Sequence, residues 1–245
     1  MKRIISGLTV LIFFTLNVSA GQNPRTVSNF NSGWNFRLGD VAKAFSPRFN
    51  DADWRKLNLP HDWAVEGDFS ENNPAGSGGG ALPGGIGWYR KTFKADKKLI
   101  GKKIFIDFDG VYSNSEVWLN GVSLGVRPYG YISFRYELTK YLKFDADNVI
   151  AVRVDNSEQP NSRWYSGCGI YRNVWLTITD PVHVDLWGTY VTTPEVSREK
   201  ATVNVVTTVK NDNNSPADVK IITIVENASG KKITEVQSVL KLETG

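Results

Sequence analysis

Hydrophobic and polar residues alternate along several stretches of the chain, and this alternation predicts β-strands. In the clearest stretches, 34–38, 104–108 and 149–155, apolar residues recur at every second position, which suits one face of a sheet. Shorter stretches that we also interpret as strands are 55–59, 88–93, 116–119, 122–126, 133–138 and 170–178. Asn120-Gly121 separates two of them and is a two-residue turn typical of a β-hairpin.

Helical patterns are few and short. A helical turn is expected at 50–55 and another at 138–142, and no stretch shows a long amphipathic helix. Many short strands separated by Gly, Pro and Asn turns are typical of an all-β sandwich. We therefore predict a jelly-roll sandwich of the galactose-binding type for residues 21–180.

The composition changes after Asp180-Pro181, where Trp and Gly become rare and Val, Thr and Lys more frequent. Four stretches predict strands, with 211–216 as a hairpin loop: 182–191, 201–209, 217–225 and 231–240. An immunoglobulin-like sandwich needs about seven strands and about 100 residues. Residues 181–245 are therefore expected to form an incomplete immunoglobulin-like β-sandwich, and we expect the natural protein to continue beyond Gly245.

Residues 1–20 predict a signal peptide. A basic start at Lys2-Arg3 precedes a mostly apolar stretch at 4–16, and Val18-Ser19-Ala20 matches the small-x-small cleavage pattern. The apolar stretch is too short to favour a membrane span, and no second one of spanning length follows. We expect cleavage after Ala20, export to the periplasm or the medium, and no membrane partner.

Charge and cysteine content narrow the possible partners. The formal net charge is +4, and without Lys2 and Arg3 there are 27 basic and 25 acidic residues, all scattered. This balance gives no support to nucleic-acid binding. Cys168 is the single cysteine and there are two histidines, too few for the usual metal clusters. We predict neither a metal nor a cofactor.

Four motifs, in this order, resemble the sugar-binding domain of glycoside hydrolase family 2, the β-galactosidase family. They are Leu-Pro-His-Asp-Trp at 59–63, Leu-Pro-Gly-Gly-Ile-Gly-Trp-Tyr-Arg at 82–90, Phe-Asp-Gly-Val-Tyr-Ser at 108–113 with Val-Trp-Leu-Asn-Gly at 117–121, and Ser-Arg-Trp-Tyr-Ser-Gly-Cys-Gly-Ile-Tyr-Arg at 162–172. The resemblance covers about residues 30–180. The β domain that follows is similar to the family's immunoglobulin-like domain.

In this family the chemistry resides in a (β/α)₈ barrel, where two glutamates perform retaining hydrolysis. The family's acid/base Glu follows an Asn, and no Glu of this chain does so; the family's Arg-x-x-His-Tyr-Pro signature is also missing. The resemblance thus implies no catalytic residue here. It implies a non-catalytic N-terminal portion of a β-galactosidase-like hydrolase, whose partners are a carbohydrate, a β-galactoside, and a catalytic barrel. A stand-alone carbohydrate-binding module is the alternative.

In parts of the family this domain lends an Asn and an acidic residue to the barrel's active site. These positions fall on Gly84 and Arg163, so neither contact carries over. Arg163 is instead a candidate donor to a sugar hydroxyl, Trp164 and Tyr165 are candidate stacking faces, and Asp62 is a candidate ligand contact. In the alternative interpretation the aromatic residues pack the loop onto the sandwich, Arg163 pairs with a carboxylate, and Asp62 forms a turn.

Overall fold

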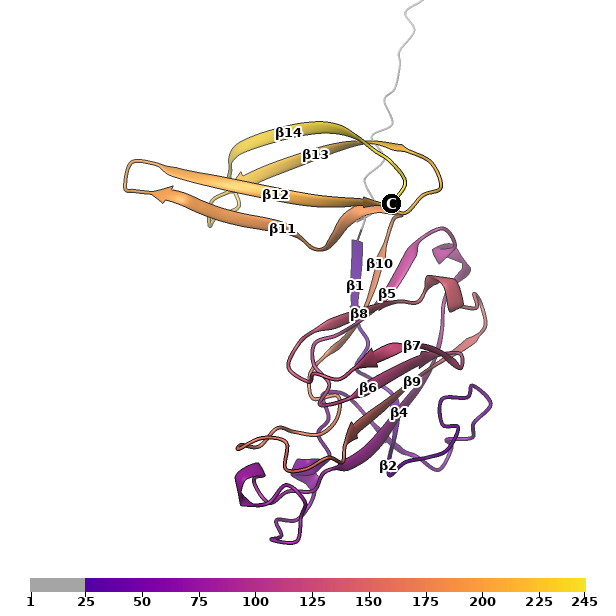
Figure 1. Cartoon of the computed structure of the whole chain (residues 1–245). Helices are drawn as coiled ribbons and strands as arrows, with labels where there is room; N and C mark the ends of the chain where they lie inside the picture. Colours follow the sequence, from indigo (N-terminus) through magenta and orange to yellow (C-terminus); the bar gives the residue numbers. More distant parts are fainter. Residues whose placement is uncertain (1–24) are drawn as a thin grey trace, which may run out of the picture.

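The computed structural model describes residues 25–245, which form fourteen strands in four sheets and confirm the predicted all-β class (Figure 1). The predicted signal peptide lies outside the described residues. Four short 3-10 helices complete the secondary structure of that range: Ala64–Glu66, Ser77–Gly79, Lys97–Leu99 and Thr139–Tyr141. The last of them confirms the turn predicted at 138–142. No helix within 25–245 has the length and apolar character to cross a membrane.

The larger sheet of the sandwich has the strand order β3-β2-β4-β9-β6-β7, with every pair antiparallel. Its strands are β2 (Trp34–Leu38), β3 (Arg55–Leu57), β4 (Gly85–Lys94), β6 (Ser115–Leu119), β7 (Val122–Arg127) and β9 (Asp147–Asn156). Asn120 and Gly121 join β6 to β7 with φ values of 53° and 86°. The predicted two-residue hairpin turn is therefore present.

The smaller sheet packs against the larger one and has the order β1-β10-β5-β8. Its strands are β1 (Arg25–Asn29), β5 (Lys103–Phe108), β8 (Phe134–Glu137) and β10 (Val174–Thr179). β1 is not among the predicted strands. It pairs antiparallel with β10, with Arg25 opposite Thr179. Because the two strands are far apart in sequence, no local pattern predicts their pairing.

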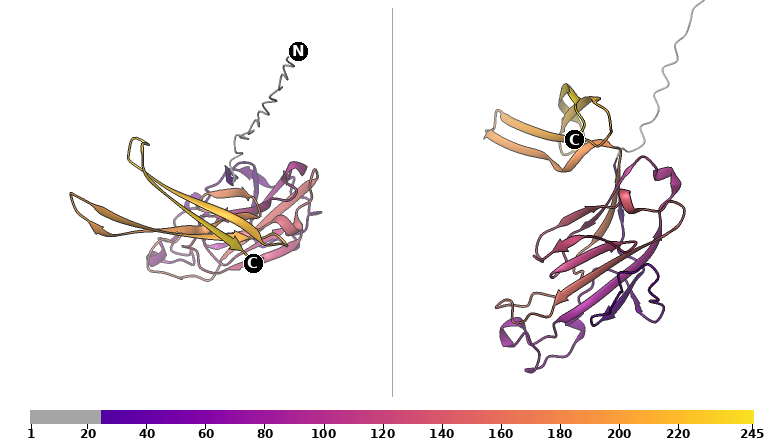
Figure 2. Two further views of the ribbon diagram at one scale, coloured as in Figure 1. Left: turned by 90° about the horizontal axis from the view of Figure 1, so that it is seen from above. Right: turned by 45° about the vertical axis from the view of Figure 1, so that its right-hand side comes forward.

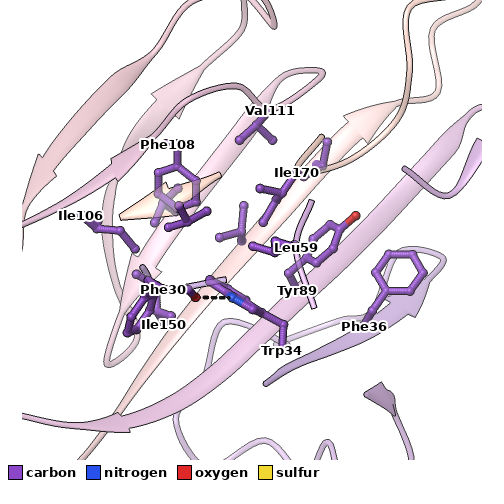
Figure 3. Packing of buried hydrophobic residues seen from close by; sticks show 14 of the residues in the cluster. Phe30, Trp34, Phe36, Leu59, Tyr89, Ile106, Phe108, Val111, Ile150 and Ile170 are labelled. Carbon is purple, nitrogen blue, oxygen red and sulfur yellow. Dashed lines mark hydrogen bonds between the residues drawn. The ribbon is translucent and has the colours of Figure 1, made fainter. Parts of the chain in front are cut away.

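The main core lies between these two sheets. The apolar positions of β5 and β9 point into it, as their alternation predicts, and their most deeply buried side chains are Ile104, Ile106, Phe108, Ile150, Val152 and Val154. Trp34 is also fully buried, and its indole Nε1 donates a 3.0 Å hydrogen bond to the carbonyl of Phe30 (Figure 3). This bond offsets the cost of burying the indole N–H.

A second, smaller core covers the outer face of the larger sheet. Trp88 stacks on Trp118 with ring centroids 5.3 Å apart, beneath the segment 39–54. The guanidinium of Arg90 is buried there and donates to Asp51 at 2.9 Å. At 50–55, where a helical turn was predicted, one hydrogen-bonded turn forms, in which the Trp54 N–H donates to the carbonyl of Asp51 at 3.1 Å, and the segment contains no helix.

The C-terminal part consists of two long hairpins, which lie one over the other at one end of the sandwich (Figures 1 and 2). β11 pairs with β12, and β13 pairs with β14. Their bounds are Val182–Val196, Ala201–Asn211, Ala217–Glu226 and Lys232–Leu242. The prediction of a hairpin loop at 211–216 is wrong, since this segment connects two separate sheets. The domain boundary at 180–181 stays a prediction.

Candidate functional site

Two loops meet at the end of the sandwich opposite the hairpins (Figure 1). One is the Gly-rich segment 67–84 that precedes β4, and the other is the segment 157–173 between β9 and β10. The Cα of Arg163 would lie 3.9 Å from a Cβ placed on Gly78, so the loops are in close contact. The four candidate sugar-binding residues all lie at or beside this junction.

Asp62 anchors the second loop to the first motif. Its Oδ1 accepts hydrogen bonds of 2.9 Å from the backbone N–H groups of Ala64 and Cys168. Its Oδ2 accepts a hydrogen bond from the hydroxyl of Tyr165. The carboxylate thus makes the turn that the alternative interpretation expects and also holds a loop about a hundred residues away in sequence.

Tyr165 contacts the Gly-rich loop as well as Asp62. Burial and the neighbouring Asp62 carboxylate raise the pKa of its phenol, which therefore stays protonated and continues to donate. The cavity between the two loops has a volume of about 10 Å³ and is lined by Tyr165, Trp164 and Leu82, among others. That volume suffices for about one water molecule, so a sugar ring has no room between the loops.

Arg163 and Trp164 are exposed candidates on this loop, and Tyr165 is also 40% exposed although its hydroxyl bonds to Asp62. The side chain of Trp164 is 61% exposed, and its Nε1 donates to the hydroxyl of Tyr131 at 3.3 Å. Arg163 is exposed and pairs with no carboxylate of residues 25–245. The ion-pair alternative for Arg163 therefore finds no support among the described residues, and its contact with sugar stays a prediction.

Two tyrosines that were not among the sequence-based candidates, Tyr129 and Tyr131, form an exposed aromatic surface together with Trp164. Tyr129 and Tyr131 lie between β7 and β8, with ring centroids 5.7 Å apart, and Tyr131 lies 5.1 Å from Tyr112. Tyr129 is 58% exposed. The available signal was Pro-Tyr-Gly-Tyr at 128–131, two aromatic residues in a turn that no strand face buries. The contact with Trp164 required the folded chain.

Cys168 serves packing rather than nucleophilic chemistry. The thiol is buried, the amide of Asn156 donates to its Sγ at 3.0 Å, and burial raises its pKa to about 12. It therefore remains a thiol at neutral pH. The neighbouring Gly169 has φ of 119°, and a Cβ there would lie 2.3 Å from the hydroxyl of Tyr89. This close approach explains the second glycine of Gly-Cys-Gly.

His61, from the same motif as Asp62, is buried below the loops. Its Nδ1 lies 2.7 Å from the hydroxyl of Tyr89, and its Nε2 lies 3.4 Å from Glu66 Oε2 without hydrogen-bond geometry. Burial lowers the pKa of His61 although Glu66 opposes the effect. Two hydrogen bonds from Arg55 lower the pKa of Glu66. His61 is buried, whereas the side chains of Arg55 and Glu66 are 56% and 38% exposed, so the imidazole is the buried part of a brace that reaches the surface.

Comparisons with known proteins identify the sandwich. Residues 81–181 match the family described as glycosyl hydrolases family 2, sugar binding domain. A β-galactosidase of Bacteroides ovatus is 60% identical over 91% of this chain and 26% of its own, and a β-glucuronidase of Formosa agariphila is 32% identical over 90% and 25%. The crystal structure of a family 2 glycosyl hydrolase from Bacteroides cellulosilyticus matches with a TM-score of 0.85 and 37% identity, over 89% of this chain and 29% of the other.

The chain spans about a quarter of the length of the curated relatives it matches. The matched region contains β4 to β10, and hence strands of both sheets of the sandwich together with the loop 157–173, whereas β1, β2 and β3 precede it. The resemblance carried by the four motifs is thus confirmed. This chain carries the N-terminal sugar-binding domain of glycosyl hydrolase family 2.

Proposed function

We propose that this chain is the non-catalytic N-terminal portion of an exported β-galactosidase-type hydrolase, which cleaves terminal β-galactosides when a catalytic barrel is present. The supporting observation is the 60% identity to the Bacteroides ovatus β-galactosidase over 91% of the chain. The identity to two Formosa agariphila proteins is lower, at 47% for a putative β-glucuronidase and 32% for a β-glucuronidase. A galactoside is therefore the substrate class that we propose.

The surroundings of Asp62 and Glu66, two carboxylates near the loops, favour a structural role for them over a catalytic one. A retaining glycosidase uses two carboxyl groups about 5 Å apart on either side of the bond that is cleaved. Asp62 is fully engaged by two backbone N–H groups and Tyr165, and Glu66 is held by Arg55. Neither is available as a nucleophile or as a general acid.

In this proposal the two loops brace the barrel and shape the entrance to its active site. Arg163 and Trp164 are the side chains that we propose for sugar contact, because both are exposed on the loop surface. Tyr165 and Asp62, which also were candidates for sugar contact, would act by holding that loop in place through their mutual hydrogen bond.

A chimaeric enzyme tests the proposal. Residues 25–245 replace the homologous N-terminal segment of the Bacteroides ovatus β-galactosidase, and the hydrolysis of a chromogenic β-galactoside is measured. We expect the chimaera to retain kcat within about tenfold, whereas deletion of the segment abolishes activity and the isolated chain hydrolyses nothing. The matched control carries the corresponding segment of the Formosa agariphila β-glucuronidase. A stable chimaera without galactosidase activity, or turnover by the isolated chain, would overturn the proposal.

The alternative of a stand-alone carbohydrate-binding module is favoured by one observation, the exposed aromatic surface formed by Tyr129, Tyr131 and Trp164. Exposed aromatic rings on a rigid β-sandwich suit the apolar faces of sugars. Sugar binding by the isolated chain is compatible with both functions. The chimaera separates them, because a stand-alone module has no surface matched to a barrel and would not sustain hydrolysis.

A further inference from the structure

A cleft is lined by residues of the outer face of the smaller sheet and of the first C-terminal hairpin. It has two adjoining parts with volumes of about 280 and 420 Å³. Arg135 and Leu186 line both parts. Together the parts reach the size of pockets that hold small ligands.

A wide bulge in β11 forms one wall of the cleft. Val184 pairs with Val209 and Thr189 pairs with Thr207, so residues 185–188 stand opposite Thr208 alone. A Cβ on Gly188 would lie 2.7 Å from the carbonyl of Thr208, so only glycine allows the bulged strand to approach β12 so closely. The bulge turns Leu186 and Trp187 toward the smaller sheet, where both line the cleft.

The backbone of Trp187 adopts an energetically unfavourable conformation. Its φ is 53°, in the left-handed region that bulky residues rarely adopt. Its side chain is nevertheless 74% exposed, so core packing does not explain the conformation. A strained backbone that presents a large apolar ring at the mouth of a cleft is a feature found at ligand-binding sites.

The opposite wall is polar and preorganised. Asp107 receives hydrogen bonds from Arg135, at 3.0 Å to Oδ2, and from the hydroxyl of Thr177 at 2.6 Å. Beside it, Trp175 Nε1 donates to Asp109 Oδ2 at 3.0 Å. Asp107 Oδ2 already accepts two hydrogen bonds, whereas Asp107 Oδ1 and the carboxylate oxygens of Asp109 retain lone pairs that can accept from a hydroxyl. Two indoles therefore flank a row of fixed acceptors and donors in one concave site.

The wider part of the cleft carries charges of both signs. Lys210 and Asp185 form an ion pair of 3.1 Å, and Asp212 lies 4.0 Å from the ring of His183. Opposite them stand Arg135 and Glu137 from β8. The side chains that line the two parts include two cationic groups, Arg135 and Lys210, and five carboxylates, so the cleft carries an excess of negative charge and disfavours an anionic ligand. It suits an uncharged ligand with many hydroxyl groups.

We propose that this cleft binds an uncharged oligosaccharide, with a pyranose ring stacked on Trp187 and with its hydroxyls bonded to Asp107, Asp109 and Arg135. Aromatic faces combined with a few fixed polar groups supply affinity and orientation for such a ligand. No residue of the segment 157–173, which carries Arg163 and Trp164, lines this site. The site therefore captures a glycan chain apart from the loop surface of the proposed function and does not depend on that proposal.

Calorimetric titration of residues 21–245 with lactose and with a short galacto-oligosaccharide tests the cleft. We expect the wild-type chain to bind the oligosaccharide and Trp187→Ala to weaken that affinity at least about tenfold. Tyr190→Ala is the matched control, because that aromatic ring is 67% exposed on the same strand, β11, and does not line the cleft. It should leave the affinity unchanged. Asp109→Ala, which removes an acceptor but no ring, should weaken binding by a smaller factor.

Thermal melting of each variant establishes that it is folded. We expect Trp187→Ala to fold, because the side chain that it removes is exposed. Absence of binding by the wild-type chain to either sugar would overturn the proposal, as would an affinity unaffected by Trp187→Ala. Loss through Trp164→Ala with Trp187→Ala unchanged would place the sugar on the loop surface instead. None of these outcomes changes the activity of the chimaera, so the two proposals fail separately.

Discussion

The sandwich and the C-terminal hairpins show the same alternation in sequence but use it differently. In the sandwich, the apolar positions of β5 and β9 face each other across a closed core and are fully buried. In the hairpins, the alternating apolar positions of β13, Val219, Ile221 and Val225, are only half-buried, and Val239 on β14 is 77% exposed. Alternation thus establishes that a stretch forms a strand. It does not establish that another layer covers the apolar face.

The difference follows from the number of strands in each layer. Ten strands in two sheets enclose the sandwich core, whereas each hairpin is a sheet of two strands. A two-stranded sheet is marginally stable on its own and gains stability when its face packs on another element. We therefore expect the stability of the described chain to reside mainly in the sandwich.

The largest effect should come from the sandwich core. Trp34 is fully buried, meets Phe30 edge to face at 6.0 Å, and also bonds to its carbonyl. Trp34→Ala should lower the free energy of unfolding by about 3–5 kcal/mol, as measured by urea denaturation. A loss below about 1 kcal/mol would mean that the region around Trp34 repacks and is not the rigid centre that we describe.

Strand existence in the sandwich was predictable, but strand partners were not. The stretches 34–38, 104–108 and 149–155 all contain strands, because one buried face imposes a period of two. The pairing of β1 with β10 joins residues about 150 positions apart. A strand of five residues has no local feature that predicts which strand it pairs with. The burial of Arg90 likewise depends on Asp51 and on a segment that folds back over the sheet.

A smaller loss is expected where the two loops are joined. Asp62→Ala removes the acceptor of two backbone N–H groups and of the Tyr165 hydroxyl. Since part-buried donors are left without a partner, we expect a loss of about 1–3 kcal/mol in urea denaturation. Asp53→Ala is the control: that carboxylate is 74% exposed and lies 3.4 Å from Arg37, so its removal should cost less than about 0.5 kcal/mol. Equal losses from both variants would show that Asp62 does not hold the loop.

The candidate site was predicted in part. The motif 162–172 directed attention to the loop that does lie at the rim, and the turn role of Asp62 was recognised as an alternative. The bond between Asp62 and Tyr165 spans 103 positions and depends on how β10 returns beside β5. The bulge at 185–188 was missed because Leu-Trp-Gly reads as a continuing strand. Only the pairing with β12 reveals the three extra residues.

A modest pH effect should arise at His61. Burial holds its folded-state pKa below the ordinary value of 6.5, so the unfolded chain takes up a proton before the folded chain does. The stabilising contribution is therefore complete above pH 6.5 and is lost as the pH falls from 6.5 toward the folded-state pKa. The unfolding free energy of the wild-type chain should decrease more between pH 7 and pH 5 than that of His61→Gln. Parallel curves would contradict this assignment.

The smallest effect is expected on the exposed face of the second hairpin. Val239 is 77% exposed and stands opposite Lys220 on β13, so Val239→Thr removes little buried area and keeps the β-branched shape that strands favour. We expect a change within about 0.5 kcal/mol in urea denaturation. A loss of 1 kcal/mol or more, growing with protein concentration, would show that a second copy covers this face. The same loss independent of concentration would mean that this face of the hairpin packs against another part of the same chain. Val239 and Trp34 would then differ only in how strongly they stabilise the fold.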